Sequence, residues 1–199
     1  MKQVDAGALN VGYAEAGPAG GSPVLLLHGW PYDIHSFVEV APLLADKGYR
    51  VLIPYLRGSG TTRFLSRDTM RNGQPGAVAT DAFAFLDALK IPKAIIGGFD
   101  WGARTANIVG AIWPERCKAM VSVSGYLVGN QAAGKQPLPP AAELQWWYQF
   151  YFATERGQAV TPSTRGTSTN SSGGWPRRSG SSTTRRSSAA PPHSTTRTT

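Results

Sequence analysis

The stretch AIIGGFDWG, residues 94–102, holds Asp100 between small residues at the end of an apolar run. The run is typical of a buried strand, and residues 103–111 are typical of a helix. Small residues on both sides of Asp100 allow the backbone to bend sharply and expose the central side chain. The pattern therefore predicts a strand, a tight turn and a helix that present Asp100 as a nucleophile. A carboxylate nucleophile suits attack on a saturated carbon, such as that of an epoxide or a carbon–halogen bond. The alternative is that Asp100 only caps the helix.

Strand-like and helix-like segments alternate on both sides of this stretch. Strands are expected as a pair over 3–17 and over 24–27, 51–53 and 120–123, and a helix over about 78–89. Another helix is expected from about Ser36 to Gly48, with Phe37, Val40, Leu43 and Leu44 on its buried face. This alternation predicts an α/β fold with a mostly parallel sheet and helices on both faces.

The chain divides into three parts by composition. Residues 1–126 are expected to form the N-terminal part of the α/β core, with the sheet incomplete at its C-terminal side. Residues 127–160 are expected to begin a helical cap, because a Gly- and Pro-containing stretch is followed by an aromatic-rich helix over 141–154. Residues 161–199 are rich in Ser, Thr and Arg and contain no Leu, Ile, Val, Phe or Tyr. Such a segment cannot bury enough apolar surface to offset the entropy of ordering it, so we expect it to be disordered.

The basic charge belongs mainly to this tail. The net charge is +8, and residues 161–199 carry six arginines and no acidic residue. The tail has two possible origins: a genuine low-complexity segment, or a gene read out of frame beyond about residue 160. We favour the second origin because the change in composition falls inside an unfinished cap.

Composition also limits the function classes. Cys117 is the single cysteine, so no intrachain disulfide and no cysteine-based metal cluster is expected. The N-terminus lacks a signal-peptide pattern, and no apolar run is long enough to span a membrane. The sequence predicts a cytoplasmic protein without metal or cofactor, and it leaves the oligomeric state open.

Two motifs together resemble a known family. His28-Gly29-Trp30-Pro31 follows one predicted strand, and Gly98-Phe99-Asp100-Trp101-Gly102 follows another. Over residues 1 to about 157 the chain resembles the epoxide hydrolase and haloalkane dehalogenase branch of the α/β-hydrolases. The resemblance implies an α/β-hydrolase core, a helical cap, no cofactor, and a small apolar electrophile as substrate.

The resemblance also implies roles for individual residues. Asp100 would attack a substrate carbon and form an alkyl-enzyme ester, which water then hydrolyses. The backbone N–H groups of Trp30 and Trp101 would bind the oxyanion that forms during hydrolysis. His28, Gly29 and Pro31 would have structural roles at the site.

The roles of two aromatic residues remain open. The resemblance implies that Tyr148 donates a hydrogen bond to the epoxide oxygen as the ring opens. The alternatives are that Tyr151 is this donor, or that Tyr148 only packs against its neighbours. The indole N–H of Trp101 would bind a departing halide in a dehalogenase, or the ring would simply form part of the pocket wall.

The sequence departs from the family pattern at the hydrolytic step. Hydrolysis needs a general base and an acid that orients it, and in this family both follow the nucleophile. After Asp100 the candidates are Glu115, Glu143, Glu155 and His193, and none stands at the end of a predicted strand. Tyr55 also stands where many relatives have Asp. We therefore expect a chain that lacks its base and acid, with negligible turnover and low solubility.

Three functional interpretations remain. The leading one is an epoxide hydrolase-like enzyme of the ether-bond class, truncated here and inactive in turnover. The second is a haloalkane or haloacid dehalogenase that uses the same Asp100. The third is a non-catalytic binding protein whose basic tail contacts an anionic surface, although no specific nucleic-acid recognition is expected.

Overall fold

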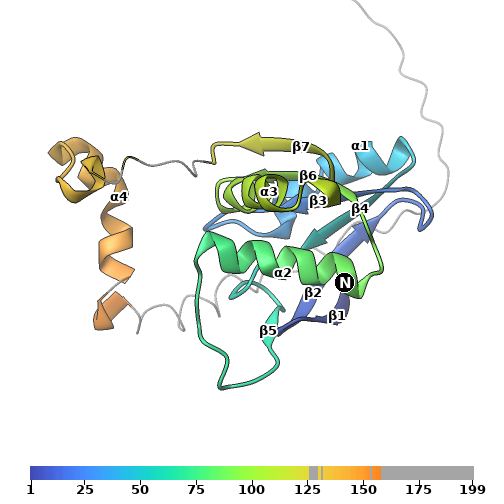
Figure 1. Ribbon diagram of the computed structural model, residues 1–199, viewed down its shortest axis with the longest axis horizontal. Helices are drawn as coiled ribbons and strands as arrows, with labels where there is room; N and C mark the ends of the chain where they lie inside the picture. The colour runs from blue at the N-terminus through green and yellow to red at the C-terminus, as the bar shows by residue number, and fades with distance from the viewer. Residues whose placement is uncertain (126–129, 131, 153, 158–199) are drawn as a thin grey trace, which may run out of the picture.

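A mixed seven-stranded sheet forms the centre of the protein (Figure 1). The computed structural model describes residues 1–125, 130, 132–152 and 154–157. The strands are β1 (Lys2–Ala6), β2 (Leu9–Ala16), β3 (Ser22–Leu27), β4 (Tyr49–Pro54), β5 (Arg63–Phe64), β6 (Ala94–Phe99) and β7 (Cys117–Val123). The α-helices are α1 (Val40–Asp46), α2 (Pro75–Ala88), α3 (Trp101–Ile112) and α4 (Pro140–Phe152). Short 3-10 helices cover Ile34–Phe37, Pro114–Arg116 and Ala133–Lys135.

The sheet is mostly parallel, as the sequence predicts. The strand order is β1-β2-β4-β3-β6-β7, and β3 runs parallel to both β4 and β6. Strands β1 and β2 are antiparallel because a tight turn at Gly7, whose φ is 57°, joins them directly. Strand β5 was not predicted from the sequence, because this two-residue strand, which pairs with β2, is too short for a periodic signal.

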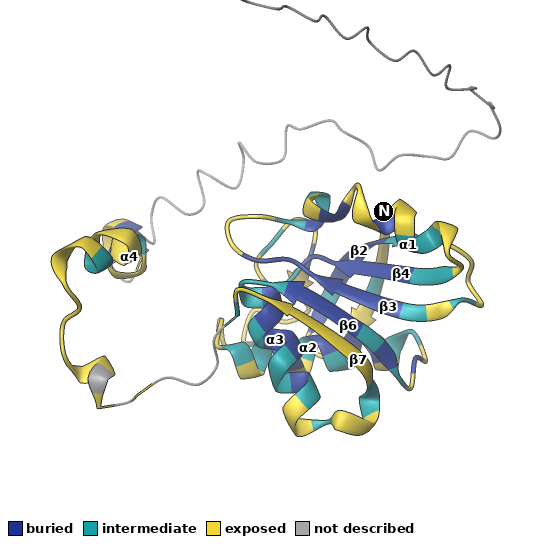
Figure 2. Cartoon of the chain, turned by 90° about the horizontal axis from the view of Figure 1, so that it is seen from above, coloured by how far each residue is buried: buried dark blue, intermediate teal, exposed yellow. Residues whose placement is uncertain are grey.

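Helices cover both faces of the sheet. On one face α2 and α3 pack over Leu25 and Leu27. On the other face α1 and the 3-10 helix Ile34–Phe37 pack over Val24 and Leu26. Successive residues of β3 thus point to opposite faces, which is why this strand is a continuous apolar run. Figure 2 shows the central strands buried and β7 exposed along its length.

The buried face of the first helical segment agrees with the prediction at Phe37 and Leu44 but not at Val40 and Leu43. Val40 and Leu43 are 42% and 67% exposed, whereas Ile34, Phe37 and Ala41 are buried. The segment starts as a 3-10 helix after Asp33, whose side chain accepts a hydrogen bond from the His35 N–H. This early turn shifts the phase of α1, so Ala41 meets the sheet in place of Val40.

Helix α4 lies in the segment predicted as the start of a cap. It stands apart from the sheet and its covering helices, beyond the carboxyl end of β7 (Figure 1). The tail, predicted to be disordered, lies outside the described residues. None of the helices in the described part combines the length and hydropathy that a membrane crossing requires.

An ion pair joins the turn after β4 to α2. Arg57 donates to both carboxylate oxygens of Asp81 and also to the carbonyl oxygens of Asn72 and Ala77. Both charged side chains are only 13% exposed. Burial raises the pKa of Asp81, against the opposing effect of Arg57.

Replacing this arginine is expected to be strongly destabilising. Arg57→Ala leaves the Asp81 carboxylate buried without its cation, so we expect a loss of about 3–5 kcal/mol in the free energy of unfolding. The matched control is Lys2→Ala, which removes a 59% exposed partner of Glu15 while Arg50 remains paired with it. The free energy of unfolding of Lys2→Ala should fall by less than about 1 kcal/mol. Urea denaturation of both variants measures this, and equal losses would contradict the prediction.

Candidate active site

The backbone at Asp100 has a strained conformation at the junction of β6 and α3. Its φ of 52° and ψ of −117° lie in a region that non-glycine residues rarely occupy. The Asp100 N–H donates to the carbonyl of Val123 on β7 at 3.0 Å, and its own carbonyl accepts from the Arg104 N–H of α3. Hydrogen bonds to the neighbouring strand and helix therefore hold the turn in place.

Glycines make this turn possible by their lack of a side chain. A Cβ on Gly98 would collide with the backbone of Gly102, and a Cβ on Gly102 would collide with the backbone of Leu27. A Cβ on Gly29 would lie 2.6 Å from both Cβ and Oδ1 of Asp100. The small residues around Asp100 thus allow β6, α3 and the loop after β3 to approach one another closely.

The carboxylate of Asp100 contacts the loop after β3. The Trp30 N–H donates to Oδ1 of Asp100 at 2.9 Å, across 70 positions in the sequence. Although Asp100 occupies the N-cap position of α3, its side chain makes no capping hydrogen bond to that helix. The alternative in which its carboxylate serves as a helix cap is therefore wrong.

Two further groups lie beside Asp100 on α3. Trp101 is the first residue of the helix, so its N–H has no intrahelical acceptor and remains available to an oxygen at the site. The guanidinium of Arg104 lies over the Trp101 ring, 4.9 Å from its centroid. The Nε of Arg104 is buried and has no hydrogen-bond partner. Arg104 was not predicted as a site residue, although its spacing from Trp101 puts both on one side of α3.

His28 is buried at the end of β3 with both ring nitrogens engaged. The Leu56 N–H donates to Nε2 at 3.1 Å, so Nε2 must be an acceptor and Nδ1 carries the proton. Nδ1 then donates to the Gly29 carbonyl at 2.9 Å. Burial lowers the pKa of the His28 imidazole. The neutral His28 ring, hydrogen-bonded through both nitrogens, thus connects the loop after β3 to the loop after β4.

The buried neutral His28 predicts a pH dependence of stability. Because the pKa is lower in the folded than in the unfolded state, the unfolded chain takes up a proton first as the pH falls. The free energy of unfolding should therefore be fully developed above about pH 7 and decline as the pH falls below the ordinary histidine pKa of about 6.5. Urea denaturation at several pH values from 8 to 5 measures this, with His28→Asn expected to flatten the profile and His35→Asn to retain it. A decline of equal slope in His28→Asn would contradict the assignment.

Aromatic side chains bring α4 to the site. The Tyr148 ring stacks on Trp30 with centroids 5.0 Å apart and an interplanar angle of 21°, and Phe152 packs edge-on against the same indole at 5.6 Å. Tyr151, the alternative proton donor, packs instead against Trp147 and Phe152. The described residues thus connect Asp100, Trp30 and Tyr148 in one series of contacts.

A second aromatic group was not anticipated from the sequence. Phe99 directly precedes Asp100, and its ring lies 5.8 Å from those of both Tyr32 and Phe37. The sequence feature that could have identified Phe99 is its position inside the motif around Asp100. These rings make one side of the loop after β3 apolar.

The acidic residues after Asp100 do not gather at this site. Glu115 is exposed in the 3-10 helix after α3, Glu143 accepts a hydrogen bond from the Leu138 N–H, and Glu155 is exposed beyond α4. His193 lies outside the described residues. Across the described ranges, no group of three or more His, Cys, Asp or Glu side chains is placed to hold a metal ion.

The strand order, the turn at Asp100 and the helices on both faces agree with a known family. The model of the alpha/beta hydrolase fold family matches residues 22–191. The chain belongs to the α/β-hydrolase family.

Individual relatives carry related names. The chain is 31% identical over 150 residues to epoxide hydrolase B of Mycobacterium tuberculosis, covering 69% of this chain and 41% of that protein. It is 29% identical over 137 residues to a haloalkane dehalogenase of Mycobacterium marinum, covering 65% of this chain and 42% of the relative.

A solved structure extends the similarity. The crystal structure of a candidate epoxide hydrolase from Klebsiella pneumoniae superposes with a TM-score of 0.76 at 63% identity, covering 81% of this chain and 54% of that one. This α/β-hydrolase chain therefore spans about half the length of the relatives that it matches.

Proposed function

We propose that this chain carries the nucleophile half of an epoxide hydrolase-like active site, with Asp100 as the attacking group. The observation that carries the proposal is the 2.9 Å hydrogen bond from the Trp30 N–H to Oδ1 of Asp100, on a turn whose glycines leave no room for side chains. The names of the relatives and the family of the fold support the reaction class.

The proposed reaction begins with displacement at carbon. The second carboxylate oxygen of Asp100 attacks an epoxide carbon, the ring C–O bond breaks, and an ester joins Asp100 to the substrate. The released oxygen takes a proton, and we assign its donor as Tyr148, which the stack on Trp30 holds near the same loop. His28, Gly29 and Pro31 shape that loop.

The second half of the reaction hydrolyses the ester. Water adds to the ester carbonyl, and the N–H groups of Trp30 and Trp101 are the proposed donors to the oxyanion. His28 is a poor base for this water because both of its nitrogens are already hydrogen-bonded. We therefore infer that this chain forms the ester but hydrolyses it very slowly.

Intact-mass spectrometry tests the first half-reaction. The chain is incubated with styrene oxide, a small apolar epoxide, and a stable mass increase of one equivalent is expected. Peptide mapping should place the added mass on the peptide that contains Asp100. Absence of an adduct on protein whose folding has been verified would overturn the nucleophile assignment, and steady-state release of diol would overturn the inferred hydrolytic defect.

A dehalogenase is the second candidate, favoured by the similarity to the Mycobacterium marinum enzyme and by Trp101 beside the nucleophile. The same experiment with 1-chlorobutane or chloroacetate distinguishes the two. Halide release with an adduct, and no adduct from the epoxide, would favour the dehalogenase. The third interpretation places binding in the basic tail, which lies outside the described residues.

A further inference from the structure

The segment between β5 and α2 contains an asparagine in a reactive setting. Asn72 is the only asparagine of the chain that a glycine follows. The backbone nitrogen of the residue after an asparagine can attack the side-chain amide carbon, and glycine leaves that nitrogen unhindered because it has no Cβ. The same segment contacts Arg57, which the reaction proposed for Asp100 does not use.

The backbone nitrogen of Gly73 is accessible. Gly73 is exposed, and within the described residues its N–H donates to no acceptor. The N–H groups on both sides of it are engaged, because that of Asn72 donates to the Met70 carbonyl at 3.0 Å and that of Gln74 donates to Oδ1 of Asn72 at 2.8 Å. The nitrogen that adjoins Asn72 is thus free to react.

Two hydrogen bonds already reach the oxygens that gain negative charge in such an attack. Loss of the Gly73 amide proton places negative charge on the backbone oxygen of Asn72, and the Arg57 guanidinium donates to that oxygen at 2.5 Å. Attack on the side-chain carbon places negative charge on Oδ1 of Asn72, which accepts from the Gln74 N–H. Both donors are in position before the reaction begins.

We propose that Asn72 is a self-modification site at which the Gly73 nitrogen closes a succinimide ring. Hydroxide removes the Gly73 amide proton, and the nitrogen then forms a bond to Cγ of Asn72. The Cγ–Nδ2 bond breaks, and ammonia leaves with a proton taken from water, which regenerates hydroxide. Water then adds to one of the two imide carbonyls and breaks its bond to nitrogen, which gives aspartate or isoaspartate. The reaction does not involve Asp100.

The position of Arg57 gives the modification a structural consequence. When water opens the ring at the former backbone carbonyl, the product is isoaspartate, and the oxygen that Arg57 contacts becomes part of a carboxylate. The same guanidinium also donates to Asp81 and to the Ala77 carbonyl of α2. The modification therefore replaces a neutral acceptor of Arg57 by a charged one where the segment joins α2.

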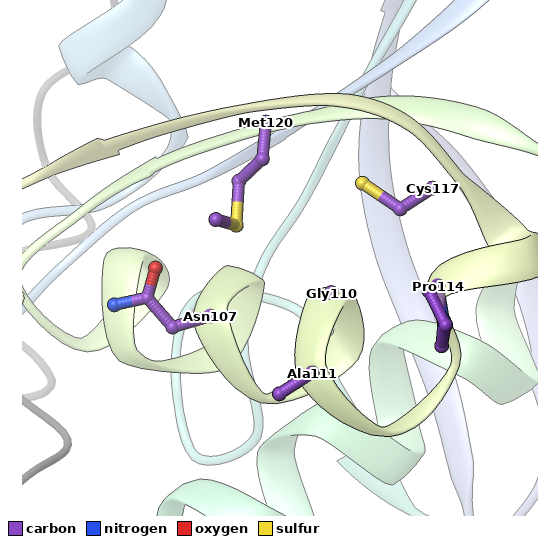
Figure 3. Close-up of a pocket in the computed structure, with 6 residues that line it drawn as sticks. All are labelled: Asn107, Gly110, Ala111, Pro114, Cys117 and Met120. Atoms are coloured by element: carbon purple, nitrogen blue, oxygen red, sulfur yellow. The ribbon is translucent and has the colours of Figure 1, made fainter.

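Two other asparagines are internal references. Asn10 lies in β2, and the buried, β-branched Val11 follows it. Asn107 lies on α3 beside a groove between α3 and β7 (Figure 3), and the N–H of the following Ile108 belongs to the hydrogen-bonded helix. The groove has a volume of about 450 Å³ and is lined by Asn107, Gly110, Ala111, Pro114, Cys117 and Met120. Neither reference offers an unhindered nitrogen.

Peptide mapping of the full chain, kept in mildly alkaline buffer, tests the proposal. We expect the peptide that contains Asn72 to gain about 1 Da, through replacement of its amide by a carboxylate, at least about tenfold faster than the peptides that contain Asn10 or Asn107. Labelling by an isoaspartyl methyltransferase should detect isoaspartate in the product. Equal rates for the three peptides would contradict the proposal, and so would a product that contains only aspartate, because direct hydrolysis gives aspartate without ring closure.

A variant and a peptide separate the contributions of Gly73 and Arg57. A Cβ at position 73 meets no atom within 4 Å, and Gly73 does not have a positive φ, so Gly73→Ala should fold normally. Its Asn72 should react at least about tenfold more slowly, because the added Cβ hinders the attacking nitrogen. A synthetic peptide of residues 69–77 lacks Arg57 and should react at least about threefold more slowly than the folded chain. An undiminished rate in Gly73→Ala, or a folded chain no faster than the peptide, would overturn the proposal.

Discussion

Asp100→Asn is expected to abolish the covalent adduct that we propose for the unmodified chain with styrene oxide. The asparagine keeps the size of the side chain and can still accept the hydrogen bond from Trp30, so the turn should persist. A neutral amide oxygen is a far weaker nucleophile than a carboxylate, and removal of a nucleophile commonly costs several orders of magnitude in rate. Intact mass after equal incubation measures the loss. An adduct of undiminished yield in Asp100→Asn would show that another side chain is alkylated.

Two variants of the loop after β3 refine this prediction. Gly29→Ala places a Cβ 2.6 Å from Oδ1 of Asp100, so either the carboxylate or the loop must shift. Because misplacement of a reacting group by about 1 Å can cost about 100-fold in rate, we expect the adduct to form at least about tenfold more slowly. His35→Ala alters a partly exposed side chain in the same loop region and should change the rate by less than about twofold. Equal rates for both variants would contradict the role of the close approach.

Gly102→Ala is expected to destabilise the fold by more than about 4 kcal/mol, at the upper end of what single substitutions do. The added Cβ would collide with backbone atoms of Leu27 and His28, and neither β3 nor α3 can move without disturbing the core between them. Backbone atoms cannot rotate away as a flexible side chain can. Urea denaturation of the variant should therefore show a large loss or no cooperative transition.

Gly110→Ala provides the matched control on the same helix. A Cβ at Gly110 would lie 3.3 Å from the Met120 Sδ, at the end of a flexible side chain in an open groove. Alanine also favours the helical conformation over glycine by about 1 kcal/mol. We expect this variant to be neutral or slightly more stable than the unmodified chain. If Gly102→Ala were equally well tolerated, the close packing of α3 against β3 would not constrain the turn.

Local patterns in the sequence account for much of the fold. The continuous apolar run of β3 and the helical spacing of Val78, Ala82 and Phe85 in α2 correctly predicted both elements, because burial on the sheet faces imposes those spacings. The pattern was wrong where Asp33 starts a 3-10 turn early and changes the phase of α1. The start of this segment depends on a local hydrogen bond, from the His35 N–H to Asp33, which hydrophobic spacing does not reveal.

The order of strands and helices along the chain, and the need for small residues around Asp100, could be predicted from the sequence because both follow from interactions between near neighbours. The contacts of Asp100 could not be predicted in this way and are known from the three-dimensional structure. Its carboxylate accepts from Trp30, its N–H donates to Val123, and Tyr148 stacks on Trp30, all across long stretches of sequence. Such contacts depend on the strand order and on how the sheet brings the loops together at one edge. No periodicity in a single segment encodes that arrangement.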